Sequence, residues 1–330
     1  MTESPATSVS VASRSALIPA TGEGPILHDL PLGDPGPGQV RVRMRAAALN
    51  FADLLMRKGT YQDTPPTPFT PGLEGAGEVE AAGPGTDLRP GTRVAVWLQG
   101  CLTQCGNFDA ADCLPLPDAM PYEDAAGFQI AYGTSHLALT LRAGLQAGET
   151  LAVLGAAGGV GLTAVEIGAA LGARVIAVAR GAEKCAIARA AGAHEVLDSD
   201  ETPDLRAALR AFGGVDVVYD PVGDAAGLAA FGGLKPGGRF LVIGFAGGKT
   251  PALPLNHALV KNITIHGIHW AAYRDLDHAA LRSSLTALFA LYEQGRLHPH
   301  NGLILPLDRL AEGYDALSER RSVGKVIITL

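Results

Sequence analysis

A chain of 330 residues is longer than one hydrophobic core usually supports, because cores stop growing at about 250–300 residues, so we expect two domains. Apolar residues make up 47% of the sequence, which excludes an intrinsically disordered protein. The formal net charge of −7 argues against nucleic acid or an anionic membrane as a partner. The 42 glycines follow no Gly-X-Y period, which excludes collagen and assigns them to turns and to close backbone approach.

Residues 1–15 are polar and lack the cationic start and apolar stretch of a signal peptide, so we expect a disordered leader. No run of 18 or more apolar residues is present, which argues against a membrane-spanning helix. Four cysteines in a chain of this length do not form a disulfide framework. We therefore expect a cytoplasmic protein that has no membrane partner.

Residues 16–135 predict a domain built mostly of strands. Residues 40–45 alternate strictly between apolar and charged side chains, and residues 75–81 and 93–98 also have strand character. Gly-Pro pairs separate these runs and predict turns. The final residues, 300–330, end in an apolar strand, and we expect them to return to this domain and complete it.

From about residue 146 the pattern changes to strands that alternate with helices. The predicted strands are 151–154, 174–179, 195–198, 216–219, 239–243 and 262–268, and the predicted helices are 162–171, 183–191, 205–212, 225–234 and 275–294. This alternation predicts a parallel sheet with helices on both faces, which we assign to residues 136–299. The fold class is therefore α/β: a β domain plus a doubly wound parallel sheet.

A glycine loop follows the first strand of this second domain. Residues 156–161 read Ala-x-Gly-x-x-Gly and lead directly into a helix, which is the setting of a dinucleotide-binding loop. The helix N-terminus offers free N–H groups to a pyrophosphate, and Gly161 would let helix and strand pack closely. The residues that we predict to bind the cofactor here are Ala157, Gly158, Gly159 and Val160. The alternative is a tight turn that binds nothing.

The end of the second strand indicates which dinucleotide is bound. A site specific for NAD usually carries an acidic residue there, whereas this chain has Arg180, followed by Lys184. Two cations suit a 2′-phosphate, so we predict NADPH. The alternative is the solvated basic start of a helix, where Glu183 partly cancels the charge.

Several segments resemble the zinc-lacking branch of the medium-chain dehydrogenase/reductase superfamily, specifically the NADPH:quinone oxidoreductase (zeta-crystallin-like) family. The matching segments are 47–53, 70–77, 155–161, 216–223, 237–245 and 324–326. The resemblance implies a GroES-like β domain, a Rossmann domain, and reduction of a quinone or another conjugated carbonyl compound. Zinc-dependent relatives carry a cysteine at the position of Asn50 and a His-Glu pair at Leu73-Glu74, so the resemblance implies no catalytic zinc.

The resemblance also implies roles for individual residues. Asn50, Asp53 and Tyr61 are expected near the nicotinamide and the substrate, with Asn50 and Tyr61 as hydrogen-bond donors. Alternatively, Asn50 and Asp53 form a helix cap and Tyr61 only packs. The remaining expected cofactor ligands are Thr134, Gly244, Phe245, His269, Trp270 and Lys325. Thr134 could instead cap a helix, and Lys325 could be an exposed surface charge.

Three cysteines, Cys101, Cys105 and Cys113, lie in a stretch that is shorter than its counterpart in the family. Their spacing does not match a structural zinc lobe, so we predict three free thiols and no metal site. The alternative is a metal that these thiols hold together with a fourth ligand. The shortened stretch leaves open which acceptor the protein reduces.

The sequence therefore predicts a zinc-independent NADPH-dependent oxidoreductase that transfers a hydride to a small-molecule quinone or other conjugated carbonyl compound. Reduction of an enone or an enoyl thioester is the alternative within the enzyme class. A non-catalytic NADPH-binding protein is the alternative outside that class. The resemblance also implies a homodimer, for which residues 262–268 are the candidate edge.

Overall fold

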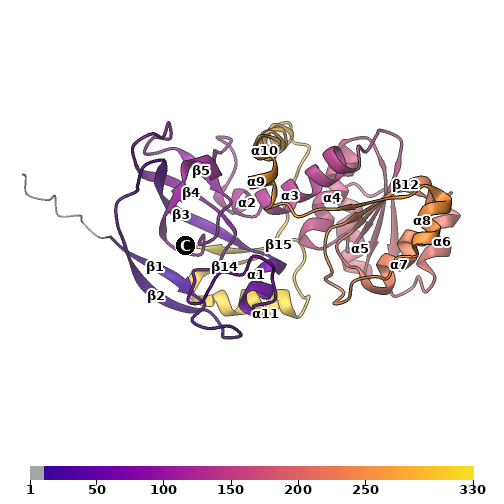
Figure 1. Ribbon diagram of the computed structural model, residues 1–330, viewed down its shortest axis with the longest axis horizontal. Helices are drawn as coiled ribbons and strands as arrows, with labels where there is room; N and C mark the ends of the chain where they lie inside the picture. Colours follow the sequence, from indigo (N-terminus) through magenta and orange to yellow (C-terminus); the bar gives the residue numbers. More distant parts are fainter. Residues whose placement is uncertain (1–10) are drawn as a thin grey trace, which may run out of the picture. The chain divides into compact units, whose positions relative to one another are not determined.

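The computed structural model describes residues 11–330, which divide into two compact units (Figure 1). Unit 1 comprises residues up to Gln129 together with Asn301–Leu330, and unit 2 comprises Ile130–His300. The chain therefore leaves unit 1 once and returns to it once.

Unit 1 is built mostly on antiparallel strands. Its strands are β1 (Val11–Leu17), β2 (Ile26–Leu32), β3 (Gln39–Leu49), β4 (Glu74–Ala82), β5 (Arg93–Val96), β6 (Cys105–Asp109), β7 (Cys113–Pro115), β14 (Asn301–Pro306) and β15 (Lys325–Thr329). Its helices are α1 (Phe51–Arg57), α2 (Tyr122–Ala126) and α11 (Leu310–Ser318), with short 3₁₀ turns at Ala110–Asp112 and Leu307–Arg309.

The main sheet of unit 1 brings the C-terminal strands β14 and β15 beside strands from the first half of the chain. Its strand order is β14-β15-β3-β4-β5-β7, and β6 also pairs with β3. The final strand, β15, is antiparallel to β3 and pairs Val326 with Leu49. Asn301–Leu330 therefore complete this unit. The alternating residues of β3, among them Val40, Val42 and Met44, lie buried in the core.

The predicted leader, residues 1–15, needs a correction. Residues 1–10 lie outside the described part of the chain, but Val11–Leu17 form β1, which pairs with β2. The polar side chains that suggested disorder are buried, because the hydroxyls of Ser13 and Ser15 lie 2.9 Å and 2.6 Å from the hydroxyl of Thr103. A partner about 90 residues away leaves no trace in the local pattern.

Unit 2 alternates strands and helices, as predicted. Its strands are β8 (Thr150–Leu154), β9 (Arg174–Ala179), β10 (Glu195–Asp198), β11 (Val215–Asp220), β12 (Leu234–Val242) and β13 (Thr264–Gly267). Its helices are α3 (Gln129–His136, which begins at the last residue of unit 1), α4 (Gly159–Ala170), α5 (Ala182–Ala190), α6 (Leu205–Ala211), α7 (Asp224–Gly232), α8 (Leu255–Lys261), α9 (Tyr273–Leu276) and α10 (His278–Glu293). A π-helical segment, Leu137–Arg142, continues α3.

The six strands of unit 2 are all parallel and lie in the order β10-β9-β8-β11-β12-β13. The order reverses between β8 and β11, so the carboxyl ends of these two strands form the switch point where doubly wound sheets bind ligands. Helices α4, α5, α7 and α8 pack against the strands.

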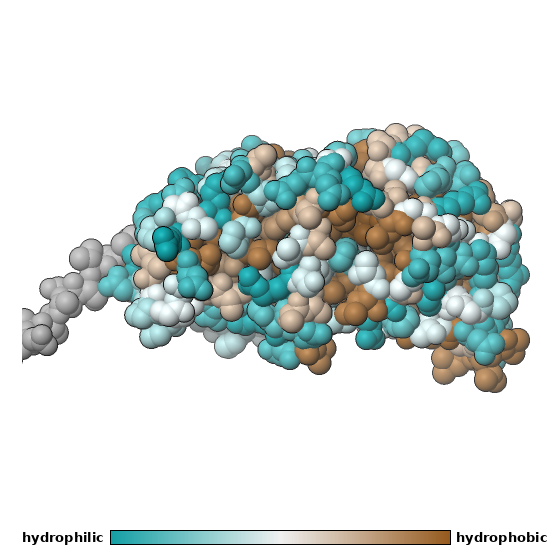
Figure 2. Space-filling model, turned by 90° about the horizontal axis from the view of Figure 1, so that it is seen from above, coloured by the Kyte–Doolittle hydropathy of each residue, from teal (hydrophilic) through white to brown (hydrophobic). Residues whose placement is uncertain are grey.

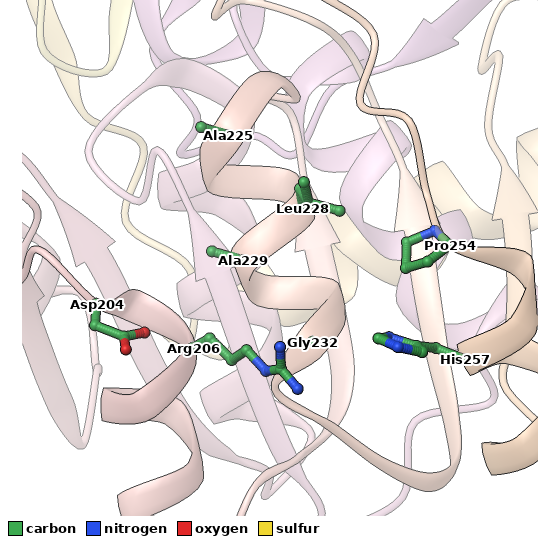
Figure 3. A pocket seen from close by; sticks show the side chains of 8 residues that line it. All are labelled: Asp204, Arg206, Ala225, Leu228, Ala229, Gly232, Pro254 and His257. Atoms are coloured by element: carbon green, nitrogen blue, oxygen red, sulfur yellow. The ribbon is translucent and has the colours of Figure 1, made fainter.

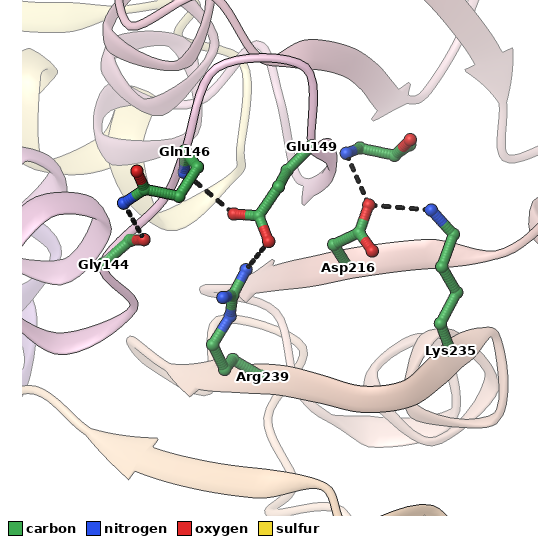
Figure 4. A network of polar contacts seen from close by, with 7 residues as sticks. Gly144, Gln146, Glu149, Asp216, Lys235 and Arg239 are labelled. Atoms are coloured by element: carbon green, nitrogen blue, oxygen red, sulfur yellow. Dashed lines mark hydrogen bonds and ion pairs between the residues drawn. The ribbon is translucent and has the colours of Figure 1, made fainter.

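Ion pairs join the opposite, amino ends of these strands (Figure 4). Glu149 pairs with Arg239 at 2.6 Å, and Asp216 pairs with Lys235 at 2.7 Å while it accepts a hydrogen bond from the backbone N–H of Thr150. These contacts connect β8, β11 and β12 at the edge away from the switch point. Their role is therefore to hold the strands together rather than to bind a ligand.

Within residues 11–330, every helix is too short or too polar to cross a lipid bilayer. Figure 2 shows apolar groups scattered among hydrophilic ones on the face that it draws.

Candidate functional site

The turn after β8 has the geometry of a phosphate-binding loop. Gly155 adopts a φ of +56°, a backbone conformation that glycine tolerates best. A Cβ at Gly161 would lie 2.1 Å from the carbonyl oxygen of Gly155, so α4 can approach the turn this closely only because position 161 has no side chain. The glycine that the sequence assigned to close packing of helix and strand therefore has that role.

The N-terminus of α4 is open to a ligand. Gly158 is the N-cap residue and is exposed, Gly159 and Val160 are partly exposed, and Ala157 is buried beneath them. The first N–H groups of any helix have no partner within the helix, and the helix dipole favours an anion there. These residues therefore fit the pyrophosphate of a dinucleotide.

Arg180 lies at the end of β9 and is exposed over 70% of its side chain. Its guanidinium Nε lies 3.5 Å from the carboxylate of Asp200, which is itself 62% exposed. Such an exposed, long pair is weak, so the cation is available to an incoming phosphate. Lys184 follows on α5, where its side chain is partly buried.

The carboxyl ends of β11 and β12 form the next part of the site. Asp220 is buried at the end of β11 and accepts hydrogen bonds from the backbone N–H groups of Val222 and Gly223, each at 2.8 Å. Burial raises the pKa of this carboxyl, and its bonds fix the turn. Gly244 and Phe245 follow β12, and Phe245 is 39% exposed. Sequence reasoning missed Asp220, although its place at the end of a predicted strand was a signal.

Thr134 and Trp270 lie on two elements that meet in unit 2. Thr134 is 8% exposed and lies inside α3, so the alternative that it caps a helix is wrong. Trp270 is 6% exposed and follows β13, after the partly exposed His269. A Cβ at Gly133 would lie 2.4 Å from the indole nitrogen of Trp270, so the ring packs directly on the backbone of α3.

In unit 1, three polar side chains from distant parts of the sequence meet at a buried cluster. The ammonium of Lys325 donates to Glu74 Oε1 at 2.8 Å and to Asn50 Oδ1 at 2.6 Å. The amide of Asn50 donates to the same oxygen of Glu74 at 3.0 Å. Glu74 is fully buried and Lys325 is only 8% exposed, so Lys325 is not a surface charge. We call Asn50, Glu74 and Lys325 the Lys325 cluster.

Asp53 lies beside this cluster and stabilises the backbone. Its carboxylate accepts hydrogen bonds from the N–H of Asn50 at 2.8 Å and from the N–H of Gly72 at 3.1 Å. The first of these bonds is the capping contact that the spacing of Asn50 and Asp53 offered as an alternative. Burial is the main cause of the raised pKa of Asp53, about 6, and the two backbone hydrogen bonds oppose it. Because both oxygens accept backbone hydrogen bonds, Asp53 connects the start of α1 to the segment that precedes β4.

Tyr61 follows α1, and its ring packs against a small apolar group that consists of Ile18, Met56 and Phe69. The side chain is partly exposed, and burial raises the pKa of its hydroxyl. A phenol with a raised pKa keeps its proton at neutral pH and remains a hydrogen-bond donor. Tyr61 therefore combines a packing role with a hydroxyl that can donate a hydrogen bond or a proton.

The three cysteines of the shortened stretch are buried free thiols. Burial raises the pKa of Cys101 and Cys105 above the ordinary thiol value, which makes them less reactive at neutral pH. Across residues 11–330, no group of three histidine, cysteine or acidic side chains is arranged to hold a metal ion.

A cavity of about 460 Å³ lies elsewhere in unit 2 (Figure 3). Helices α6 and α7 and the start of α8 line it, with Leu228, Arg206 and His257 among the lining residues. It contains none of the predicted site residues. The predicted cofactor residues follow the carboxyl ends of the strands instead, or lie on α3 and in the Lys325 cluster.

Comparison with known proteins agrees with this architecture. Residues 36–140 match the family model of the alcohol dehydrogenase GroES-like domain, and residues 159–285 match the model described as zinc-binding dehydrogenase. Quinone oxidoreductase-like protein 2 of Mus musculus is 35% identical over 308 residues, which cover 89% of this chain and 86% of the mouse protein.

Solved structures show the same similarity. The quinone oxidoreductase of Thermus thermophilus, determined also as its complex with NADPH, is 32% identical with a TM-score of 0.85 and covers 96% of this chain and 100% of its own. The quinone oxidoreductase of Pseudomonas syringae is 29% identical with a TM-score of 0.89, at 96% and 100% coverage.

The antiparallel unit is thus a GroES-like domain, and the parallel unit is a Rossmann domain whose glycine loop fits a nicotinamide dinucleotide. The chain belongs to the medium-chain dehydrogenase/reductase family of oxidoreductases and is similar to its quinone oxidoreductase-like members.

Proposed function

We propose that this protein is a zinc-independent reductase that uses NADPH to reduce a quinone or another conjugated carbonyl compound. The observation that carries the proposal is the open N-terminus of α4 next to a strand end that bears Arg180 rather than an acidic residue. The names of the relatives in mouse and Thermus point to the same class of acceptor.

The choice of NADPH rests on charge. An acidic side chain at the end of the second strand would accept hydrogen bonds from a ribose 2′-OH and would repel a 2′-phosphate. Arg180 offers a planar cation with several N–H donors, which suits a phosphate. Lys184, in the first turn of the next helix, adds a second positive charge.

Independence of zinc rests on the Lys325 cluster. Zinc-dependent members of the family hold their metal at the positions of Asn50 and Leu73, and an amide and an aliphatic side chain are poor zinc ligands. The ammonium of Lys325 donates to Asn50 and is paired with the buried carboxylate of Glu74. A divalent cation beside a buried ammonium would be strongly repelled.

When bound, the dinucleotide would supply a hydride to the acceptor. The chain must then bind the acceptor, stabilise the negative charge that develops on its oxygen, and deliver a proton. The hydroxyl of Tyr61 keeps its proton at neutral pH and is our proposed proton donor, with water as the alternative source. We assign Asp53 a supporting role, because both of its oxygens hold backbone N–H groups.

The test is a substrate panel for the purified full-length chain. NADPH consumption is measured with a benzoquinone, a naphthoquinone, an enone and an enoyl-CoA, each with and without a strong zinc chelator. We expect turnover with a quinone that the chelator leaves unchanged. Turnover with the enoyl-CoA alone would favour the alkene reductase instead, and tight NADPH binding with no consumption would favour a non-catalytic protein.

A further inference from the structure

The hydrogen bonds of the Lys325 cluster leave two N–H donors unused. An ammonium has three N–H donors, and Lys325 directs two of them to Glu74 and Asn50. A carboxamide has two, and Asn50 directs one of them to Glu74. In residues 11–330 no further partner of Lys325 Nζ or Asn50 Nδ2 is seen, so each group keeps one donor for a ligand.

Both donors are held in place by one buried oxygen. Glu74 Oε1 lies 2.8 Å from Lys325 Nζ and 3.0 Å from Asn50 Nδ2, so the two nitrogens are neighbours. The bond from Lys325 to Asn50 Oδ1 also fixes the orientation of the amide, because an ammonium can approach only the oxygen end. The nitrogen end of Asn50 therefore stays available as a donor.

We propose that Lys325 and Asn50 together bind the carbonyl oxygen of the acceptor and stabilise its negative charge during reduction. This inference rests on the proposed function and deepens it by assigning Lys325 as a catalytic residue. An ammonium and an amide N–H that are fixed before the reaction stabilise a developing oxyanion with little reorganisation. Asn50 is partly exposed whereas Lys325 is 8% exposed, so an oxygen would have to reach the pair from the side of Asn50.

The chemistry balances without a further reactant. When bound, the reduced nicotinamide would supply a hydride, that is two electrons and one hydrogen nucleus, which would form a C–H bond on the acceptor and leave NADP⁺. The negative charge then rests on the acceptor oxygen, next to Lys325 Nζ and Asn50 Nδ2. A proton from Tyr61 or water neutralises it, and solvent restores the proton on Tyr61.

The first experiment compares Lys325→Met with wild type by steady-state kinetics. Removing one donor of an oxyanion site lowers kcat by about 10²- to 10³-fold, and we expect that loss here with a KM that changes only a few-fold. Lys325→Arg keeps the charge and should retain more activity than Lys325→Met. Lys58→Met removes an exposed lysine of the same unit and should leave kcat unchanged.

A folding control is needed because Lys325→Met removes the ammonium that pairs with the buried carboxylate of Glu74. The double variant Glu74→Gln/Lys325→Met removes both charges. It should fold, as judged by circular dichroism and thermal unfolding, and should lose kcat to a similar extent. A folded double variant with wild-type kcat would overturn the proposal.

A second readout does not depend on turnover. We use para-nitrophenol as an uncharged probe whose phenolate form resembles the oxyanion and absorbs visible light. A cationic donor pair should bind the phenolate and lower the apparent pKa of the bound phenol in wild type and in Lys58→Met. The shift should disappear in Glu74→Gln/Lys325→Met, and an equal shift in that variant would contradict the inference.

The affinity for NADPH, measured by fluorescence titration, separates this inference from two other outcomes. If Lys325→Met weakens NADPH binding while kcat is preserved, Lys325 contacts the cofactor as the sequence predicted, and the inference is wrong. If wild type oxidises no NADPH with any acceptor, the proposed function fails. The phenolate measurement then still decides whether the donor pair binds an oxyanion.

Discussion

Glu166 is a buried carboxyl group, and burial makes its charged form unfavourable. It lies on α4, is 6% exposed, and accepts hydrogen bonds from the hydroxyl of Tyr132 and from the backbone N–H of His298 at 3.0 Å. Burial raises its pKa from 4.5 to about 7, although both hydrogen bonds act in the opposite direction. Tyr132 and His298 lie within three residues of the points where the chain enters and leaves unit 2.

Glu166→Gln should therefore stabilise the protein above about pH 5, by an amount that grows until the pH passes about 7. A raised folded-state pKa means that the contribution of Glu166 to stability is fully present below pH 4.5 and is lost as the pH rises through about 7. Glutamine fills the same space without a charge, so at about pH 8 it should raise the unfolding free energy by about 3 kcal/mol. At about pH 4 the two proteins should be nearly equal.

Denaturant unfolding at the two pH values is the measurement. Glu183→Gln is the matched control, because Glu183 is exposed on α5 and its replacement should change the unfolding free energy by less than about 0.5 kcal/mol at either pH. A Glu166→Gln protein that is less stable than wild type at both pH values would show that the charged form is needed.

Arg180 and Asp200 form a second pair whose roles can be separated. Arg180→Ala should weaken NADPH binding by on the order of tenfold and leave NADH nearly unchanged, because only NADPH carries the 2′-phosphate. Asp200→Asn should strengthen NADPH binding a few-fold, since it removes the anion that lies 3.5 Å from the guanidinium. Titration of both dinucleotides measures this. Equal losses for NADPH and NADH in Arg180→Ala would mean that Arg180 does not recognise the phosphate.

At the scale of elements, the glycine loop and α4 carry two glycines with different roles. A Cβ at Gly161 would lie 2.1 Å from a backbone oxygen that cannot move away cheaply, so Gly161→Ala should lower the unfolding free energy by about 1–3 kcal/mol. A Cβ at Gly158 would lie 3.3 Å from the same oxygen, and its φ of −81° suits alanine. Gly158→Ala should therefore fold normally.

Binding of NADPH, in contrast to stability, should be affected by Gly158→Ala. The backbone at Gly158 is exposed where a pyrophosphate would approach, so a methyl group there should weaken NADPH by on the order of tenfold or more. Calorimetric unfolding and NADPH titration of the same samples test this. If Gly158→Ala binds NADPH as wild type does, the loop does not contact the phosphates as we propose.

Elements with a strong local pattern could be predicted from the sequence. The alternation of strands and helices gave the six strands of the parallel sheet, because each buried strand and each amphipathic helix carries its own periodicity. The predicted helix over 275–294 is divided, because the side chain of Asp277 accepts a hydrogen bond from Ala280 N and starts α10 anew after α9. In the sequence, such an N-cap is only a single polar residue within a helical pattern, which is too weak a signal to predict the break.

Contacts between distant segments could not be predicted. Lys325 meets Glu74 across 251 residues of sequence, and neither residue has a local signal for the other. The sequence therefore led to Lys325 as a cofactor ligand through the resemblance alone. For the same reason β1 could not be predicted, because the hydroxyls of its buried serines have their hydrogen-bond partner in the distant Thr103.

At the scale of the whole molecule, one edge strand of the parallel sheet could pair with another chain. β13 is the last strand in the order, and among the described residues its one strand partner is β12. Three apolar side chains of the neighbouring α8 are strongly exposed: Leu255 at 70%, Leu259 at 79% and Val260 at 80%. A free sheet edge beside exposed apolar groups is a surface that a two-fold dimer would cover.

We therefore predict a homodimer that joins through β13 and α8 of two copies. Sedimentation equilibrium should give twice the chain mass of 33.9 kDa for wild type. The double variant Leu259→Asp/Val260→Asp should be monomeric and folded, because both side chains are exposed within the single chain and lose no internal packing. Ile26→Asp changes an apolar side chain of unit 1 that is 50% exposed, and it should leave the dimer intact. A wild-type monomer, or a dimer that survives both aspartates, would show that this edge and this helix face do not hold two copies together.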